Sequence, residues 1–245
     1  TSGLFSEIVL LDANQKKAEG EAADISHGIA FTQPCIVRAG DYKDLAECGL
    51  IVIAAGANQK PGETRIELLG RNRVIMQTII EQIMPVNQEA ILLIVSNPVD
   101  LLTYMAQKLS GLPAGRVIGS GTVLDTARLK HLLGQYLQVD SRNVHAFIIG
   151  EHGDSELAVW SSANISGVDL DDYCRICGKD PSHEALHKIY ISVRDAAYSI
   201  IDGKGATYYG IGLAVRRIAE AIVRNEHSVL PVSSMVSGHY GISDL

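Results

Sequence analysis

The sequence lacks a basic excess, a long apolar run and the cysteine density of a disulfide-stabilised protein. Its formal net charge is −7 over 245 residues, whereas proteins that bind nucleic acid through phosphate contacts usually carry a positive excess. No apolar run approaches the ~20 residues that a membrane helix needs. The first residues show no charged-then-apolar signal pattern. We therefore expect neither a nucleic-acid partner nor membrane insertion.

Cysteine is scarce and scattered. Four cysteines are too few for a disulfide scaffold in a chain of this length. Cys174 and Cys177 form a single CxxC pair, while Cys35 and Cys48 lie in separate segments. Zinc sites of this kind usually need a second pair. We therefore predict no bound metal, and a cytoplasmic location fits this use of cysteine.

In the first half of the chain, short apolar runs alternate with helical patterns. The predicted strands are 7–12, 35–40, 50–56, 90–97 and 116–121. Most are continuously apolar, which is typical of strands buried on both faces of a parallel sheet. Residues 16–28 and 65–85 show helical spacing between them. This alternation predicts a doubly wound α/β domain with a parallel sheet.

The second half has a different pattern. Residues 143–153 and 156–165 are predicted strands, close in sequence and hence antiparallel. Two long amphipathic helices are predicted to follow, over 183–205 and 207–225. We therefore expect an α+β domain here and place the boundary near residue 120, between domains 1–119 and 120–245.

An acidic residue ends the first predicted strand. In a dinucleotide-binding fold, an acid such as Asp12 at the tip of the second strand accepts hydrogen bonds from the adenosine ribose and repels a 2′-phosphate, which favours NAD over NADP. Taken alone, Asp12 could equally be an acidic turn residue. The glycine-rich phosphate loop normally lies ~20 residues before that acid. Only eleven residues precede Asp12, so we expect the first strand and its loop to be missing and the chain to be truncated at both ends.

Four motifs occur in order along the chain: ANQKPGETR, VSNPVD, GSGTVLDTAR and IGEHGDSE. Together they resemble the L-lactate/malate dehydrogenase family, and the resemblance covers essentially the whole chain. It implies an incomplete, Rossmann-like NAD-binding domain over 1–119 and a substrate-binding catalytic domain over 120–245. It also implies NAD as the cofactor, with contacts at Asp12, Gly56 and Asn97.

The resemblance also implies a catalytic set for reducing a 2-keto acid. Arg128 would anchor the substrate carboxylate, since a guanidinium binds it at two points. Arg65 would polarise the carbonyl from a closing lid. His152 would transfer the proton, and Asp125 would orient the ring and favour imidazolium. By sequence alone, Asp125 could instead form only a helix salt bridge with Arg128.

Three further positions concern the substrate. The resemblance places Asn97 at the reacting oxygen and Thr207 in the pocket lining. Gln59 occupies the lid position at which malate dehydrogenases carry Arg; a neutral side chain suits a methyl group and rejects an unpaired carboxylate. Pyruvate and L-lactate are therefore the expected pair. Oxaloacetate and malate are the alternative, and a larger apolar 2-keto acid is also conceivable.

Assembly and regulation are implied by the family alone. Its members form homotetramers, and bacterial members bind fructose 1,6-bisphosphate through a His at the position of His145 and an Arg at that of Lys130. This chain keeps the His, but its Lys preserves only the charge and not the two-point geometry. The resemblance thus leaves activation by the sugar phosphate open.

Two other classes of function compete with a dehydrogenase. The chain could be a non-catalytic piece, because the expected loss of a central strand would expose two strand edges and remove the pyrophosphate anchor. It could also be a metal-dependent hydrolase using His152, Asp154 and the CxxC pair. The motif around His152 lacks the i, i+4 histidine pair of helical zinc proteases, which disfavours the latter.

Overall fold

The structure is a computed structural model that describes residues 2–57, 65–180, 182–238 and 241, with the backbone alone described for 65–68 and 183. The chain divides into two compact units. The first comprises residues 1–119, 216–228 and 234–245, and the second comprises residues 120–215 and 229–233. Helix α8 (Tyr209–Val223) contributes residues to both.

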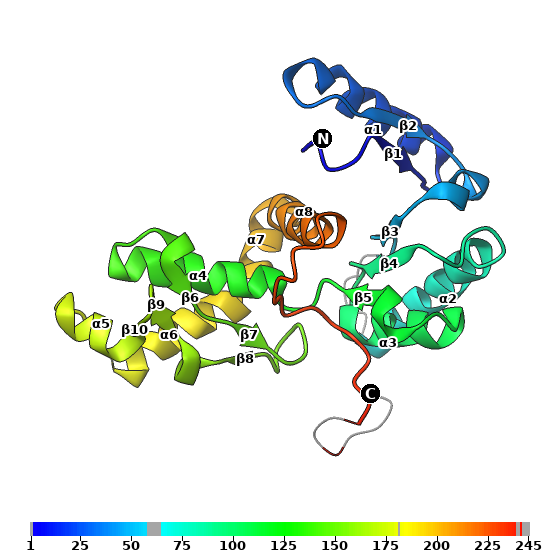
Figure 1. The fold of residues 1–245 in the computed structure, drawn as a ribbon. Helices are drawn as coiled ribbons and strands as arrows, with labels where there is room; N and C mark the ends of the chain where they lie inside the picture. Colours follow the sequence, from blue (N-terminus) through cyan, green and yellow to red (C-terminus); the bar gives the residue numbers. More distant parts are fainter. Residues whose placement is uncertain (1, 58–64, 181, 239–240, 242–245) are drawn as a thin grey trace. The chain divides into compact units, whose positions relative to one another are not determined.

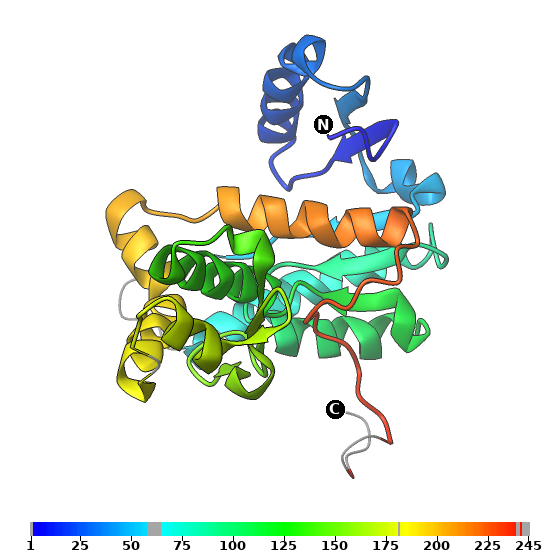
Figure 2. The same ribbon diagram turned by 60° about the vertical axis from the view of Figure 1, so that its left-hand side comes forward.

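The first unit is built from parallel strands and covering helices (Figure 1). In chain order its elements are β1 (Glu7–Leu10), α1 (Gln15–His27), η1 (Ile29–Phe31), β2 (Ile36–Ala39), η2 (Tyr42–Glu47), β3 (Leu50–Ile53), α2 (Arg65–Ile83), β4 (Ile91–Ile94), α3 (Val99–Ser110), η3 (Ala114–Arg116) and β5 (Val117–Gly119). Strands β1 and β2 pair in parallel beside α1 (Figure 2), and β3, β4 and β5 form a second parallel sheet in that order.

The five predicted strands and their parallel pairing are confirmed, although each strand is shorter than its apolar run. The middle strand β4 explains why alternation is absent from the sequence. Leu92, Leu93 and Ile94 are all 0% exposed, because a central strand covered on both faces has no polar side. Among the described residues, β1–β2 and β3–β4–β5 share no ladder, so β1 and β3 are edge strands.

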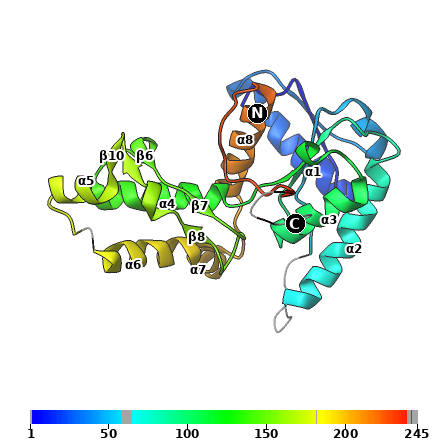
Figure 3. The ribbon, with the colours of Figure 1, turned by 60° about the horizontal axis from the view of Figure 1, so that its bottom comes forward.

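The second unit combines short antiparallel strands with helices. In chain order its elements are α4 (Val123–Leu137), η4 (Ser141–Asn143), β6 (Val144–His145), β7 (Ile148–Ile149), β8 (Leu157–Ala158), η5 (Trp160–Ser162), β9 (Asn164–Ile165), β10 (Val168–Asp169), α5 (Leu170–Ile176), α6 (His183–Arg194) and α7 (Ala196–Lys204). The predicted antiparallel pairing is confirmed for β7 with β8, and β9 pairs with both β6 and β10. The core lies where α4 packs against α6 (Figure 3).

The prediction of one helix over 183–205 is wrong. Helix α6 ends at Arg194, and α7 begins at Ala196. Asp195 caps α6 through its backbone N–H, which donates to the carbonyls of Ile191 and Val193. Helical spacing of apolar residues continues across the break, so the pattern could not reveal it. Helices α3 and α5 were not predicted at all. Among the described residues, none of the helices combines the length and apolar content needed to cross a membrane.

Candidate active site

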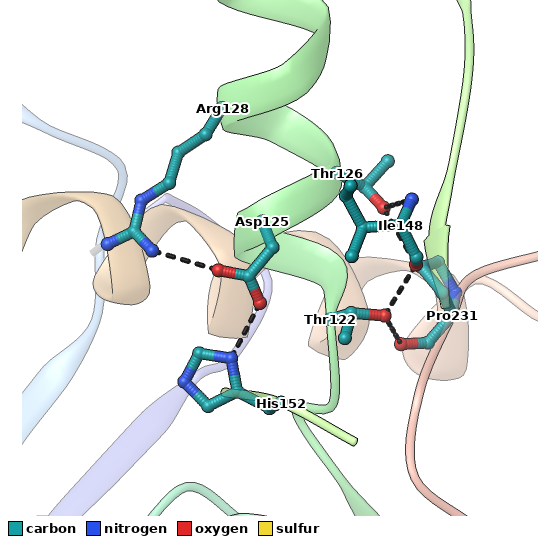
Figure 4. Close-up of polar contacts among 7 residues, drawn as sticks. All are labelled: Thr122, Asp125, Thr126, Arg128, Ile148, His152 and Pro231. Carbon is teal, nitrogen blue, oxygen red and sulfur yellow. Dashed lines mark hydrogen bonds and ion pairs between the residues drawn. The ribbon is translucent and has the colours of Figure 1, made fainter. Parts of the chain in front are cut away.

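The site is built around the first turn of α4. Gly121 precedes the helix with φ +49°, and a Cβ there would lie 2.6 Å from the Pro231 carbonyl oxygen, so only glycine fits. Thr122 donates its hydroxyl to the Ile148 carbonyl at 2.6 Å, and Thr126 accepts from the Ile148 N–H at 2.9 Å (Figure 4). These buried bonds tie strand β7 to α4 and hold the loop after β7 beside the helix start.

That loop brings His152 to Asp125. Asp125 lies in the first turn of α4 with its side chain 2% exposed, and its Oδ2 lies 2.6 Å from His152 Nδ1 (Figure 4). An ionised carboxylate only accepts hydrogen bonds, so the proton of this bond belongs to Nδ1. The imidazole therefore has Nε2 as its atom for proton exchange.

Arg128 engages the other carboxylate oxygen. Its Nη1 donates to Asp125 Oδ1 at 2.8 Å, and its side chain is 15% exposed. The sequence left open whether Asp125 pairs with Arg128 or with His152, and the structure shows both bonds at once. A guanidinium has five N–H donors in a fixed fork, so Arg128 keeps donors to offer beyond Asp125.

Glu156 belongs to the same cluster and was missed by the sequence interpretation. Glu156 is 4% exposed. One of its carboxyl oxygens, one Asp125 carboxyl oxygen and one His152 ring nitrogen all lie within 4.8 Å of one another. Burial first, and the Asp125 charge second, raise the pKa of Glu156 to about 7. In the sequence, the only indication of a role for Glu156 was its position as an acidic residue next to an apolar strand.

A metal assignment finds little support at this cluster. Asp125 already accepts from Arg128 through one oxygen and lies in hydrogen-bond contact with His152 through the other, so we assign no ion there. The hydrolase alternative needed Asp154, which instead accepts from the Tyr198 hydroxyl at 3.0 Å, and Cys174, which is buried in α5. Within the described residues, neither belongs to a group that could hold a metal.

Asp12 lies in the first unit, just after β1, and is exposed. Its Oδ1 accepts from the Asn14 backbone N–H at 2.9 Å, and its Oδ2 accepts from Lys17 Nζ at 3.1 Å. These bonds, the Asn14 one first, lower the pKa of the Asp12 carboxyl. An exposed, ionised carboxylate at the carboxyl end of a parallel strand is the group that ribose hydroxyls require.

Gly56 lies after the carboxyl end of β3, and Asn97 lies after the carboxyl end of β4. Both residues are exposed. The buried Asn72 of α2 connects their loops: its Oδ1 accepts from the Ala57 N–H at 2.7 Å, and its Nδ2 donates to the Asn97 carbonyl at 2.8 Å. Ser96 adds a hydroxyl bond to the Ala55 carbonyl at 2.6 Å. The exposed backbone is thus held firmly where a dinucleotide would lie in such a fold. Asn72 and Ser96 were not predicted; the one hint of Asn72 was a polar residue within an apolar helix pattern.

The remaining predicted residues are not brought to the His152 cluster by any described contact. Gln59 lies outside the described residues, and Arg65 begins α2 with its side chain likewise outside them. Thr207 is half-buried just before α8. Lys130 is half-buried on α4 and His145 is exposed on β6; no interaction between these two is found in the described part of the chain.

The first unit is a parallel α/β unit of the nucleotide-binding type, and the second presents a His–Asp pair with an Arg bonded to the same Asp. These features are typical of NAD-dependent dehydrogenases of small hydroxy acids. Residues 1–119 match the family description "lactate/malate dehydrogenase, NAD binding domain", and residues 122–245 match "lactate/malate dehydrogenase, alpha/beta C-terminal domain". The chain belongs to the lactate/malate dehydrogenase family.

Individual relatives agree. The chain is 57% identical to an L-lactate dehydrogenase of Acetivibrio thermocellus, covering 100% of this chain and 77% of that protein. It is 54% identical to L-lactate dehydrogenase 1 of Clostridium acetobutylicum, covering 99% and 78%. A solved lactate dehydrogenase from a Medee basin deep-sea metagenome library matches with a TM-score of 0.93 and 54% identity, covering 99% of this chain and 77% of that one.

Proposed function

We propose that this protein is an NAD-dependent L-lactate dehydrogenase, which interconverts pyruvate and NADH with L-lactate and NAD. The observation that carries the proposal is the 2.6 Å contact between His152 Nδ1 and the buried Asp125 carboxylate. A buried carboxylate beside an imidazole favours the imidazolium, which is the form that can protonate an alkoxide. The names of the relatives support the choice of reaction.

In pyruvate reduction, the bound nicotinamide supplies a hydride to the substrate. His152 donates its Nε2 proton to the forming alkoxide, while Asp125 stabilises the ring through Nδ1 and fixes its orientation. Arg128 donates one N–H to Asp125, and its other guanidinium N–H groups can bind the substrate carboxylate. In lactate oxidation, neutral His152 accepts the proton at the same atom.

The preference for lactate over malate follows from Gln59. The resemblance places this residue where family members contact the substrate's side chain. A neutral Gln at that position would leave a second carboxylate without a partner, and desolvating an unpaired charge is costly. Comparing kcat/KM for pyruvate and oxaloacetate tests this choice directly. Pyruvate should be the better substrate; a preference for oxaloacetate would assign the protein to the malate side of the family.

The main test of the proposal is His152→Asn. We expect pyruvate reduction to fall by roughly a thousandfold or more, because the proton donor is lost. NADH binding, followed by its fluorescence, should persist. His187→Asn, an exposed histidine of α6, is the matched control and should keep its activity. Near-normal turnover by His152→Asn would remove the assignment, and no turnover by the unmodified protein would favour the non-catalytic alternative.

We further propose a cytoplasmic homotetramer whose activity responds to fructose 1,6-bisphosphate. The exposed His145 and the cationic Lys130 support an anion site, although burial lowers the pKa of Lys130 and its side chain lacks a guanidinium fork. Analytical ultracentrifugation tests the tetramer. Titrating activity with the sugar bisphosphate, in parallel with His145→Gln, tests the site; an unchanged response in the variant would exclude His145.

A further inference from the structure

Glu156 is a buried acid with one unpaired oxygen. It immediately precedes β8 and is 4% exposed. Its backbone carbonyl accepts from the Tyr190 hydroxyl at 2.7 Å, which anchors this end of the loop to α6. Its carboxyl oxygen Oε1 is buried without a hydrogen-bond partner among the described residues. A buried unpaired carboxylate is costly, so its position calls for a functional explanation.

Four charged groups act on Glu156. From α4, Asp125 and Arg128 act on it; from α6, Arg194 does so; and from its own loop, His152 does so. One atom from each of the Glu156 carboxyl, the Asp125 carboxyl and the His152 ring lies within 4.8 Å of the other two. The imidazole thus has a second carboxyl group close by, in addition to the one that touches it.

These surroundings oppose one another. Burial and the Asp125 charge favour the neutral acid, while His152, Arg128 and Arg194 favour the carboxylate. The balance raises the pKa of Glu156 to about 7. Glu156 therefore exchanges its proton in the neutral range, where an enzyme using a histidine for proton transfer would also operate.

We propose that Glu156 is a positioning residue for proton transfer: a reversible second counter-charge that stabilises the His152 imidazolium when it ionises and withdraws that support when it is protonated. Asp125 is the carboxyl group in direct contact with the ring, at 2.6 Å. Glu156, within the same 4.8 Å group of atoms, supplies a negative charge only when it is ionised. The inference rests on the proposed proton-transfer role of His152.

The direction of the effect follows from reciprocity. If protonated His152 favours ionised Glu156, then ionised Glu156 must equally favour protonated His152. As the pH rises, Glu156 loses its proton and the imidazolium becomes harder to deprotonate. His152 therefore keeps its proton to a higher pH than Asp125 alone would allow, and the range for pyruvate reduction extends upward.

The direct test is an NMR titration of the His152 ring in the unmodified protein and in Glu156→Gln, with the signal assigned by its loss in His152→Asn. Gln keeps the shape and removes the conditional charge. We expect the His152 midpoint to fall by roughly one pH unit, since a charge about 5 Å away in a partly buried site shifts a titration by that order. Glu151→Gln is the matched control: this acid lies in the same loop but is exposed, so water screens it.

An unchanged or raised His152 midpoint in Glu156→Gln would overturn the proposal, and so would an equal fall in Glu151→Gln. Glu156→Asp, which retains the charge, should restore most of the midpoint; failure to do so in a folded variant would point to a purely structural role. This titration needs no turnover, so it can fail or succeed independently of the proposed reaction.

The kinetic test uses the pH profile of kcat/KM for pyruvate reduction. In Glu156→Gln its alkaline limb should move to lower pH by about the same unit, with a smaller change at low pH, where Glu156 is already neutral. A uniform loss at all pH values would overturn the conditional role. If the unmodified protein reduces no pyruvate, the proposed function fails, while the NMR titration still tests the coupling.

Discussion

Asp12 and Asp125 are both paired with cations, but the two units of the chain place them in opposite surroundings. Asp12 follows β1. Its side chain is 33% exposed, and that of its partner Lys17 is 60% exposed. Asp125 lies in α4 with its side chain 2% exposed, and its partners His152 and Arg128 are 24% and 15% exposed. One ion pair is open to water, and the other is enclosed by protein.

The difference in burial assigns the two acids different tasks. Exposed ion pairs contribute little to stability because water screens them and long side chains lose entropy. The proposed cofactor contact of Asp12 therefore requires only that the exposed Lys17 ammonium be exchanged for a ribose hydroxyl, at small cost. Buried charges cannot move or lose a partner cheaply. Asp125 is held in place, which suits its proposed role of stabilising the His152 imidazolium.

The largest effect is expected at the enclosed acid. Asp125→Asn should lower kcat/KM for pyruvate reduction by on the order of a thousandfold, because a neutral amide no longer stabilises the imidazolium and can present a donor to Nδ1. Steady-state assays with NADH measure the loss. Asp12→Asn is the matched substitution at the exposed acid. If both variants lost activity equally, the contrast between the two acids would be wrong.

The second effect concerns pH and stability. The pKa of Glu156 rises from its ordinary 4.5 to about 7 on folding. The folded state therefore holds a proton that the unfolded chain has released, so this group's stabilisation is fully present below about pH 4.5 and is lost as the pH rises through 7. Relative to Glu156→Gln, the unmodified protein should lose roughly 3 kcal/mol of unfolding free energy between pH 4.5 and 8.

Denaturant unfolding across that pH range measures the difference, and Glu151→Gln should leave it unchanged because that acid is exposed. A difference between Glu156→Gln and the unmodified protein that does not vary with pH would show that the carboxyl titrates normally. The absolute stability of the variant is less informative, since the new amide must find partners of its own.

A smaller effect is expected at the cofactor end. Asp12→Asn should raise KM for NADH by up to about tenfold, since a charged acceptor for ribose hydroxyls becomes neutral. The same change removes the repulsion of a 2′-phosphate, so the preference for NADH over NADPH should narrow by a similar factor. Measuring both cofactors separates a lost ribose contact from general damage, which would weaken both equally.

Sequence reasoning succeeded where a residue's role depends on local pattern. The apolar run at β4 predicted a buried parallel strand, and the spacing of Asp125 and Arg128 predicted a shared helix face. It failed where the role depends on distant partners. Nothing near Glu156 in the sequence reveals that Asp125 lies beside it. Asn72 acquires its importance from the Ala57 N–H and the Asn97 carbonyl, both distant in sequence. The α6–α7 break was missed because the apolar spacing continues across Asp195, at which α6 ends and after which α7 begins.

The smallest effect is expected from Lys17→Met. Its ion pair with Asp12 is exposed on both sides, so Tm should stay within about 2 °C of the unmodified protein. Activity with NADH should change by less than about threefold, because Asp12 keeps its Asn14 bond and its charge. Loss of the nearby ammonium should still sharpen rejection of NADPH, since that cation offsets the repulsion of a phosphate. A large loss of stability would mean that Lys17 and Asp12 form a structural pair after all, and that the open and enclosed acids differ less than their burial implies.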